Sequence, residues 1–276
     1  MKLPLISLFL LIGLANLAGA RPQRVVSMNV CTDQLAMMLA APGQLLSVSY
    51  LARDPRASAM APEAMAHGVN HGLAEEIYLQ QPDLVIAGSF STLATVDMLR
   101  RLDVPVVVFE PARSFKDVRA VITQMGEVLG RQEAAELLLQ DYDTGLAALQ
   151  VDEADGPRAA IYSTRGWMAG EQTLSGQILK AAGLHNIAAE MGMDAGGVLP
   201  MEQLALSNPD LVITSQSYPG HSRAEEYLQH PVVVHLRARS GQALMSDRDW
   251  VCGTPYVLNA VRELGKARDA WQEGNK

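Results

Sequence analysis

The sequence predicts an α/β protein of two Rossmann-like lobes with parallel sheets, joined by one long connecting helix, with a ligand cleft between the lobes. The motif E-x6-PDLVI begins at Glu75 and again at Glu202, a constant offset of 127 residues. Short apolar runs alternate with helical patterns in both halves, as in parallel sheets covered by helices. A long helical pattern separates the two halves. Two similar lobes imply a cleft between them, and clefts are common ligand sites.

The first lobe is expected to span residues 21–113. It begins with a strand at 24–28, followed by a helix for which Thr32 or Asp33 is a suitable N-cap and which Pro42-Gly43 ends. The remaining elements alternate in the same way: a strand at 45–48, a helix at 73–81 that ends before Pro82, a buried strand at 84–87, a helix at 92–102 and a strand at 106–109.

The connecting segment, residues 114–150, carries apolar residues at helical spacing from Phe115 to Leu138. Ser114 is a good N-cap with Asp117 three residues later. The favoured interpretation is one helix of about 37 residues, roughly 55 Å long. The alternative is two ordinary helices broken near Gly130-Arg131.

The second lobe is expected to span residues 151–276. A strand at 158–163 opens it, and a helix at 174–182 is closed by Gly183. The repeated motif follows, and the apolar run Pro231-Val232-Val233-Val234 is interpreted as the strand equivalent to 105–108. An amphipathic helix at 257–270 closes the lobe.

Residues 1–20 have the pattern of a cleaved export signal: Lys2, an apolar stretch, and the small-x-small site Ala18-Gly19-Ala20. The apolar stretch is shorter than the about 20 residues that span a membrane, so an uncleaved anchor is less favoured. Arg21 rather than a cysteine follows the cut, so lipid attachment there is not expected. We therefore expect a soluble exported protein.

The formal net charge of −8 argues against nucleic acid as a partner, because nucleic acid binding needs a basic face. No G-x-S-x-G, Walker or G-x-G-x-x-G motif is present. We expect no enzyme activity, no catalytic residue, no cofactor and no metal site. His67-x3-His71 has helical metal-ligand spacing, but the neighbouring glycines disfavour a helix there.

Several motifs together resemble a known family. The opening R24-V-V-S followed by Thr32-Asp33, the PDLVIAG stretch around Leu84, the long central helix and the segment from Ser246 to Pro255 resemble periplasmic solute-binding proteins of importers for cobalamin and ferric siderophores. The resemblance implies a monomer in the periplasm that captures an iron–siderophore complex or a cobalamin-type corrinoid and delivers it to the membrane permease of an ABC importer.

The family presents one glutamate from each lobe to arginines of the permease, seven residues before the proline of each Pro-Asp strand. The resemblance therefore assigns permease docking to Glu75 and Glu202. Equivalent positions on two similar lobes also suit a two-fold permease dimer. The alternative is that both are ordinary solvated helix carboxylates.

Ligand candidates come from the loops after the carboxyl ends of the strands, where open α/β sheets bind ligands. Aromatic residues offer large, stiff contact faces, and arginines suit an anionic chelate or a corrin phosphate. The arginines at 53 and 248 could instead pair with the aspartates beside them. The candidates are Asn29, Cys31, Tyr50, Arg53, Phe90, Arg165, Trp167, Tyr218, Arg248 and Trp250.

The two cysteines, Cys31 and Cys252, are expected in cleft loops, one in each lobe. Three interpretations stay open: inert small apolar residues, which is the favoured one, a bridge across the cleft, or thiols directed at the ligand. A bridge is expected to hinder ligand release. The alternative function, a metal- or heme-binding periplasmic chaperone or enzyme, would use these two cysteines and histidines.

Overall fold

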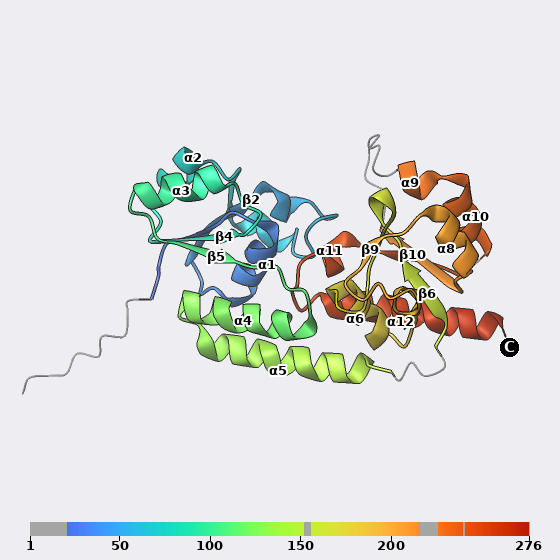
Figure 1. Cartoon of the computed structure of the whole chain (residues 1–276). Coiled ribbons are helices and arrows are strands. Elements are labelled where there is room, and N and C mark those ends of the chain that lie inside the picture. Colours follow the sequence, from blue (N-terminus) through green and yellow to red (C-terminus); the bar gives the residue numbers. More distant parts are fainter. Residues whose placement is uncertain (1–20, 152–155, 216–225, 240, 276) are drawn as a thin grey trace, which may run out of the picture.

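The computed structural model describes residues 21–151, 156–215, 226–239 and 241–275. The predicted export signal and Tyr218 lie outside these ranges. Figure 1 shows two α/β lobes with two helices, α4 and α5, along one side of the molecule. The predicted fold class, two lobes with parallel sheets, is confirmed. Within the described ranges, no helix combines the length and apolar character needed to cross a membrane.

The described part of the first lobe contains a five-stranded parallel sheet in the order β3-β2-β1-β4-β5. Strand β4 is buried along its whole length because helices cover both faces of the sheet. The strands are β1 (Val25–Ser27), β2 (Leu45–Ser49), β3 (Gly68–Asn70), β4 (Leu84–Gly88) and β5 (Val106–Phe109). The helices are α1 (Val30–Leu39), α2 (Ala74–Tyr78) and α3 (Leu93–Arg101), with short 3-10 turns η1 (Tyr50–Arg53) and η2 (Glu63–Ala66).

Helix α1 begins earlier than predicted. Its N-cap is Asn29, whose side-chain oxygen accepts a hydrogen bond from the N–H of Cys31 at 3.0 Å. Thr32 and Asp33, the predicted caps, lie inside the first turn. Either asparagine or aspartate caps a helix well, so the pattern alone did not decide between these neighbouring positions.

In the second lobe, the described strands form a four-stranded parallel sheet in the order β11-β10-β6-β8 and a short antiparallel pair, β7-β9. The strands are β6 (Arg158–Ile161), β7 (Trp167–Met168), β8 (His185–Asn186), β9 (Gly197–Val198), β10 (Leu211–Ser215) and β11 (Gly241–Met245). The helices are α6 (Leu174–Ala181), α7 (Ile187–Glu190), α8 (Met201–Ser207), α9 (Glu226–Gln229), α10 (Pro231–Arg239), α11 (Asp247–Trp250) and α12 (Val257–Gly274), with the 3-10 turn η3 (Thr164–Gly166).

One predicted strand of the second lobe is wrong. The run that begins at Pro231 forms helix α10, and the strand that corresponds to β5 is β11, about ten residues further on. Proline is well tolerated at the first position of a helix because its missing N–H would have no partner there. The three valines that favoured a strand therefore lie in a helix, with Val233 fully buried.

The repeated Pro-Asp motif has a structural reason that both lobes share. Asp83 accepts a hydrogen bond from the backbone N–H of Arg24 at 2.9 Å, and Asp210 accepts one from the N–H of Arg158, also at 2.9 Å. Each aspartate thus ties the start of its own strand to the start of the neighbouring strand, β1 in the first lobe and β6 in the second. The sequence repeat marks a true structural repeat.

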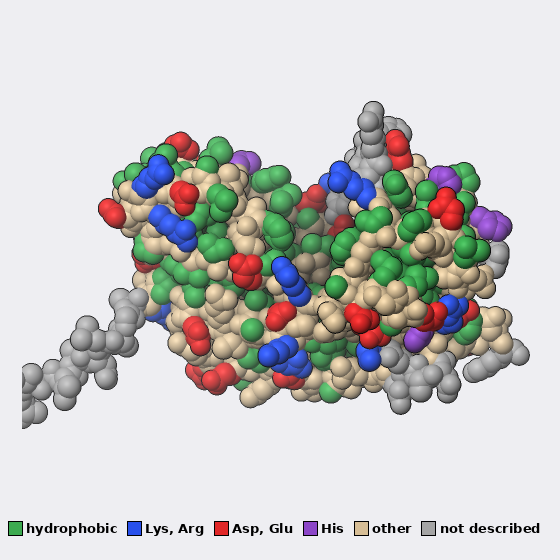
Figure 2. Space-filling model, viewed as in Figure 1, with side chains coloured by type: hydrophobic (Ala, Val, Ile, Leu, Met, Phe, Trp, Pro, Cys, Tyr) green, Lys and Arg blue, Asp and Glu red, His purple; other side chains and the backbone are tan. Residues whose placement is uncertain are grey.

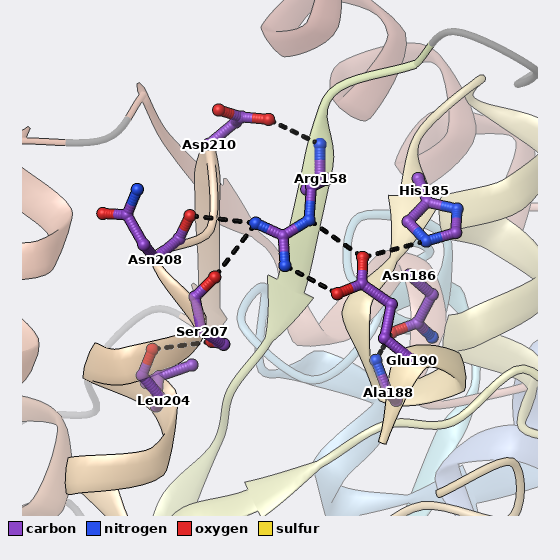
Figure 3. Close-up of polar contacts among 9 residues, drawn as sticks. All are labelled: Arg158, His185, Asn186, Ala188, Glu190, Leu204, Ser207, Asn208 and Asp210. Atoms are coloured by element: carbon purple, nitrogen blue, oxygen red, sulfur yellow. Dashed lines mark hydrogen bonds and ion pairs between the residues drawn. The ribbon is translucent and has the colours of Figure 1, made fainter. Parts of the chain in front are cut away.

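In the second lobe Arg158 also belongs to a larger network of hydrogen bonds (Figure 3). The guanidinium of Arg158 donates to the carbonyls of Ser207 and Asn208 and forms two hydrogen bonds with Glu190, at 2.8 and 2.6 Å. The same carboxylate lies 3.1 Å from His185. Hydrogen bonding with Arg158 lowers the pKa of Glu190. The network lies where the strands begin, at the edge of the sheet away from the ligand loops.

The prediction of a single connecting helix is also wrong. Two helices, α4 (Phe115–Leu129) and α5 (Gln132–Leu149), fold back on each other, and the chain reverses at Gly130, which has a left-handed φ of 64°. The break falls where the alternative interpretation placed it. Ser114 caps α4 as predicted, since its hydroxyl accepts a hydrogen bond from the N–H of Asp117.

The helix pair contacts both lobes. Helix α4 packs on α1 of the first lobe, while α5 packs on α12 of the second. One continuous apolar core includes residues of both sheets, such as Val25 and Ile161, together with Ile122 of α4 and Leu264 of α12. Because the lobes share this core, the structure favours small rocking of the lobes over wide hinge opening.

Candidate ligand cleft

The loops after the carboxyl ends of the strands meet between the two lobes. Figure 2 shows the surface hollowed there, on the side away from α4 and α5. At the base of this cleft lies a mostly apolar hollow of about 130 Å³. It is lined by residues of α1 with its N-cap and of α4, by the ends of β4 and β5 with the segments after them, and by the segment after α11: Asn29, Cys31, Thr32, Leu35, Gly88, Ser89, Phe90, Phe109, Glu110, Pro111, Ala112, Val121, Val251, Gly253 and Thr254. A second hollow of about 390 Å³ adjoins it through Ala112 and Val251.

A disulfide joins the lobes at the base of the cleft. Cys31 in the first turn of α1 is bonded to Cys252, between α11 and α12, with their Cα atoms 4.9 Å apart. The favoured interpretation, two inert thiols, is therefore wrong, and so is the prediction of thiols directed at a ligand. Beside the bridge, Gly253 packs so closely on Ala112 that a Cβ atom would collide there. The two lobes thus touch around the disulfide.

The position of the disulfide removes the objection that it would hinder release. The bridge lies beside Ala112, which directly precedes the connecting helices, rather than across the mouth of the cleft. When two bodies rock about a contact, points at that contact move least. A bond at the base of the cleft therefore permits rocking that opens the mouth.

Of the ten predicted ligand residues, four line the two hollows. Asn29, Cys31 and Phe90 line the first, and Trp250 lines the second. The ring of Phe90 is 84% exposed in the turn after β4, so it offers an aromatic face at the first hollow. Asn29 is close-packed against Gly88, where any Cβ atom would collide with its amide. The amide of Asn29 is therefore held rigidly at the cleft base.

Two of the predicted arginines already have partners within the protein. Arg53 donates hydrogen bonds to the carbonyls of Ala64 and His67, the second at 2.6 Å, and so fastens the loop between η1 and η2. Arg248 lies 3.7 Å from the carboxylate of Asp249. Self-pairing was the stated alternative for Arg248; for Arg53 the partners are backbone carbonyls instead of Asp54, which pairs with Arg56.

The remaining candidates lie apart from the two hollows. Arg165 is exposed in η3 with a left-handed φ of 59°. Trp167 pairs with Val198 between β7 and β9 and is 45% exposed. Tyr50, 53% exposed at the end of β2, stacks on the ring of His71 with the ring centres 5.5 Å apart.

Some residues of the cleft were missed. His71 was set aside as a surface histidine, yet it follows β3 at the same sheet edge and, with Tyr50, forms an aromatic pair. The segment Glu110–Ala112 was also overlooked. It follows β5, and the rule that selected the loops after the other parallel strands applies to it equally.

His67 and His71 flank strand β3, so their spacing is not helical. Among the described residues, no group of three or more metal-ligating side chains comes together. The lining of the two hollows offers aromatic and apolar contact in the first and several polar side chains in the second.

One ionisable group is buried just beneath the cleft floor. Asp33, in the first turn of α1, is fully buried and accepts hydrogen bonds from the backbone N–H and the hydroxyl of Ser49. Burial raises the pKa of Asp33 to about 7, against the opposing effect of these hydrogen bonds. The carboxyl joins α1, which carries Cys31, to Ser49 at the end of β2, directly before Tyr50.

The two predicted docking glutamates lie on equivalent helices of the two lobes. Glu75 is exposed in the first turn of α2, and Glu202 is exposed in the first turn of α8. Each is followed two residues later by a fully buried apolar residue, Ile77 or Leu204. The two glutamates therefore have the same orientation relative to their own lobes.

Two parallel-sheet lobes that share a core and face each other across a cleft lined by strand ends define a two-lobed solute-binding protein. The family described as periplasmic binding protein matches residues 25–241, and the chain belongs to this family.

A cobalamin-binding protein from Halobacterium salinarum is 27% identical over 203 residues, which cover 72% of this chain and 55% of that protein. The chain thus spans about half the length of this curated relative. Among solved structures, the periplasmic heme-binding protein RhuT from Roseiflexus sp. RS-1 has a TM-score of 0.72 at 21% identity, covering 91% of this chain and 99% of that one. The periplasmic vitamin B12-binding protein BtuF of Vibrio cholerae has a TM-score of 0.60 at 17% identity, covering 92% and 99%. The likeness to these two structures concerns the fold.

Proposed function

We propose that this protein is exported to the periplasm, captures a cobalamin-type corrinoid between its lobes and delivers it to the membrane permease of an ABC importer. The observation that carries the choice of ligand is the mostly apolar first hollow, which Phe90 lines, with Trp250 in the adjoining second hollow. The similarity to a cobalamin-binding protein supports the same choice.

The electrostatics of the cleft favour a corrinoid over an anionic ferric siderophore. A polyanionic chelate needs several arginines with free donors. Here Arg53 donates to backbone carbonyls and Arg248 lies beside Asp249. In the described part of the chain, the cations left for such a chelate are Arg113 in the second hollow and the exposed Arg165. A corrin ring instead needs large apolar contact faces, which Phe90 and the Tyr50–His71 pair provide. Since 130 Å³ is small for a ligand pocket, the ring would lie above the hollow and only a peripheral group would enter it.

Heme is the second candidate. Tyrosine and histidine both bind heme iron, and Tyr50 and His71 present a phenol and an imidazole together at the edge of the first sheet. The metal chaperone or enzyme that would use two thiols loses its support, because Cys31 and Cys252 are bonded to each other.

Native mass spectrometry of the ligand-free protein with equal concentrations of cyanocobalamin, hemin and ferric enterobactin, a trianionic tris-catecholate chelate, separates these ligands. The proposal predicts one cyanocobalamin per chain as the dominant complex. A dominant hemin complex would support the second candidate, and a dominant ferric enterobactin complex would contradict the electrostatic argument.

Docking on the permease is assigned to Glu75 and Glu202, one from each lobe. Arginine–carboxylate pairs across an interface fix register and orientation. The double variant Glu75→Arg/Glu202→Arg should abolish uptake of labelled cyanocobalamin in cells while its affinity for cyanocobalamin stays unchanged. Glu133→Arg/Glu136→Arg, which reverses two exposed charges on α5, is the matched control and should keep uptake. A loss of ligand affinity in the docking variant would refute the docking role.

A further inference from the structure

Two leucines lie almost wholly in solvent at equivalent positions of the two lobes. Leu79 is 80% exposed at the end of α2, and Leu206 is 84% exposed on α8. They are separated by the same offset as the two docking glutamates, and each follows its glutamate by four residues. Large apolar side chains this exposed are ordinary when they are scattered. Because they recur at equivalent positions of both lobes, we look for one function that both leucines share.

The packing of the two helices is also the same. Ile77 and Leu204, at matching positions between each glutamate and its leucine, are both fully buried. Residues four apart lie on the same side of a helix. Leu79 continues the helical backbone of α2, with φ −63° and ψ −20°. Each lobe therefore presents one carboxylate and, one turn further on, one exposed leucine.

Further exposed apolar residues lie close by in sequence. Leu73, directly before α2, is 57% exposed, and Val198, shortly before α8, is 66% exposed. Figure 1 places α2 and α8 on different lobes, both away from α5. A partner that engages both leucines at once must therefore reach across the two lobes.

We propose that Leu79 and Leu206 form the apolar half of the docking surface and insert into an apolar pocket on each of the two permease subunits. This inference rests on the proposed function. Two equivalent subunits would offer a cation and an adjoining apolar pocket twice, which matches a carboxylate and a leucine presented twice. Burying the leucine also excludes water from the neighbouring ion pair, and such exclusion strengthens a charged contact at an interface.

A photo-cross-linking amino acid placed at position 79 or 206 of the full-length protein in its own cells tests contact directly. Both positions should form adducts with one and the same integral membrane permease. Matched controls are positions 93 and 137, where Leu93 of α3 and Leu137 of α5 are 75% and 58% exposed. These controls should form no such adduct.

A cross-linker at position 203, where Gln203 is exposed beside Glu202, distinguishes the role of the leucines from docking through the glutamates. Adducts from 203 without adducts from 79 and 206 would overturn the role of the leucines and leave docking through the glutamates intact. No permease adduct from any of the three would overturn docking itself. Adducts with a second copy of this chain would assign the leucines to self-association and overturn the proposal.

Substitution supplies a second measurement. Leu79→Gln/Leu206→Gln should lower uptake of labelled cyanocobalamin about tenfold or more, because burial of one leucine is worth about that factor in an equilibrium constant. The affinity of the purified variant for cyanocobalamin should equal that of the wild type. Leu93→Gln/Leu137→Gln should transport normally. Undiminished uptake by the first variant would contradict the proposal.

Discussion

Single residues decide the chemistry of the cleft through the partners they already have. Asn29 and Phe90 line the first hollow and Trp250 lines the second, because parallel strands end at one edge. Sequence could not indicate that Arg53 is occupied by carbonyls of residues 64 and 67, since those contacts depend on how a loop folds. An arginine near a cleft is therefore a weak predictor of an anionic ligand.

The buried carboxyl of Asp33 makes the free energy of unfolding depend on pH. Its pKa is raised from 3.8 to about 7, so the folded protein holds this proton more tightly than the unfolded chain. The stabilisation is complete below the unfolded pKa and is lost as pH rises towards about 7. Asp33→Asn keeps a neutral side chain, so its free energy of unfolding relative to wild type should increase between about pH 4 and 7 and then level off.

Denaturant unfolding of both proteins at several pH values measures this difference. Asp54→Asn is the control, because hydrogen bonding with Arg56 lowers the pKa of Asp54. That variant should gain no relative stability as pH rises. A difference between Asp33→Asn and wild type that is independent of pH would show that the buried carboxyl is charged in both states.

Among the helices and strands, those whose positions depend on a local sequence motif were predicted best. The Pro-Asp motif located β4 and β10 because its aspartate ties two neighbouring strands together. The helix break was harder to locate, since both α4 and α5 are amphipathic and the apolar pattern runs on past Gly130. Strand β11 was missed because its sequence, GQALM, lacks β-branched residues. The strand was predicted instead at the valines of α10, because valine is common in strands.

The helix hairpin depends on close contact at Gly126. A Cβ atom there would collide with the side chain of Ala135 on α5. Gly126→Ala should therefore destabilise the protein by about 1–3 kcal/mol, the usual cost of overpacking. Gly265→Ala is the matched control, since Gly265 lies in α12 with no atom near its missing Cβ. It should stabilise the protein by about 0.5–1 kcal/mol. Thermal unfolding of both variants measures these changes, and equal changes in stability would contradict the close contact at Gly126.

For the whole molecule, the disulfide and the shared core determine how far the lobes can part. Cys31 and Cys252 are 221 residues apart in sequence, so the bridge greatly restricts the unfolded chain. Cys31→Ala/Cys252→Ala should lower the free energy of unfolding by about 2–5 kcal/mol.

Because the lobes share one core, that variant should still bind cyanocobalamin. Its rate of ligand dissociation should stay close to that of wild type, since the bridge lies at the base of the cleft, where rocking moves the chain least. Denaturant unfolding and stopped-flow dissociation measure the two effects. Complete loss of binding would show that the bridge, and not the shared core, holds the lobes in register.

A corrinoid bound between the lobes is expected to lie against Phe90. Isothermal titration with cyanocobalamin measures this contact, using wild type, Phe90→Ala, and Leu137→Ala of α5 as the control for an exposed apolar residue outside the cleft. We predict one site per chain and about tenfold weaker binding for Phe90→Ala only, on the scale of one lost aromatic contact. The absence of binding by wild type, or equal affinity in Phe90→Ala, would contradict the account.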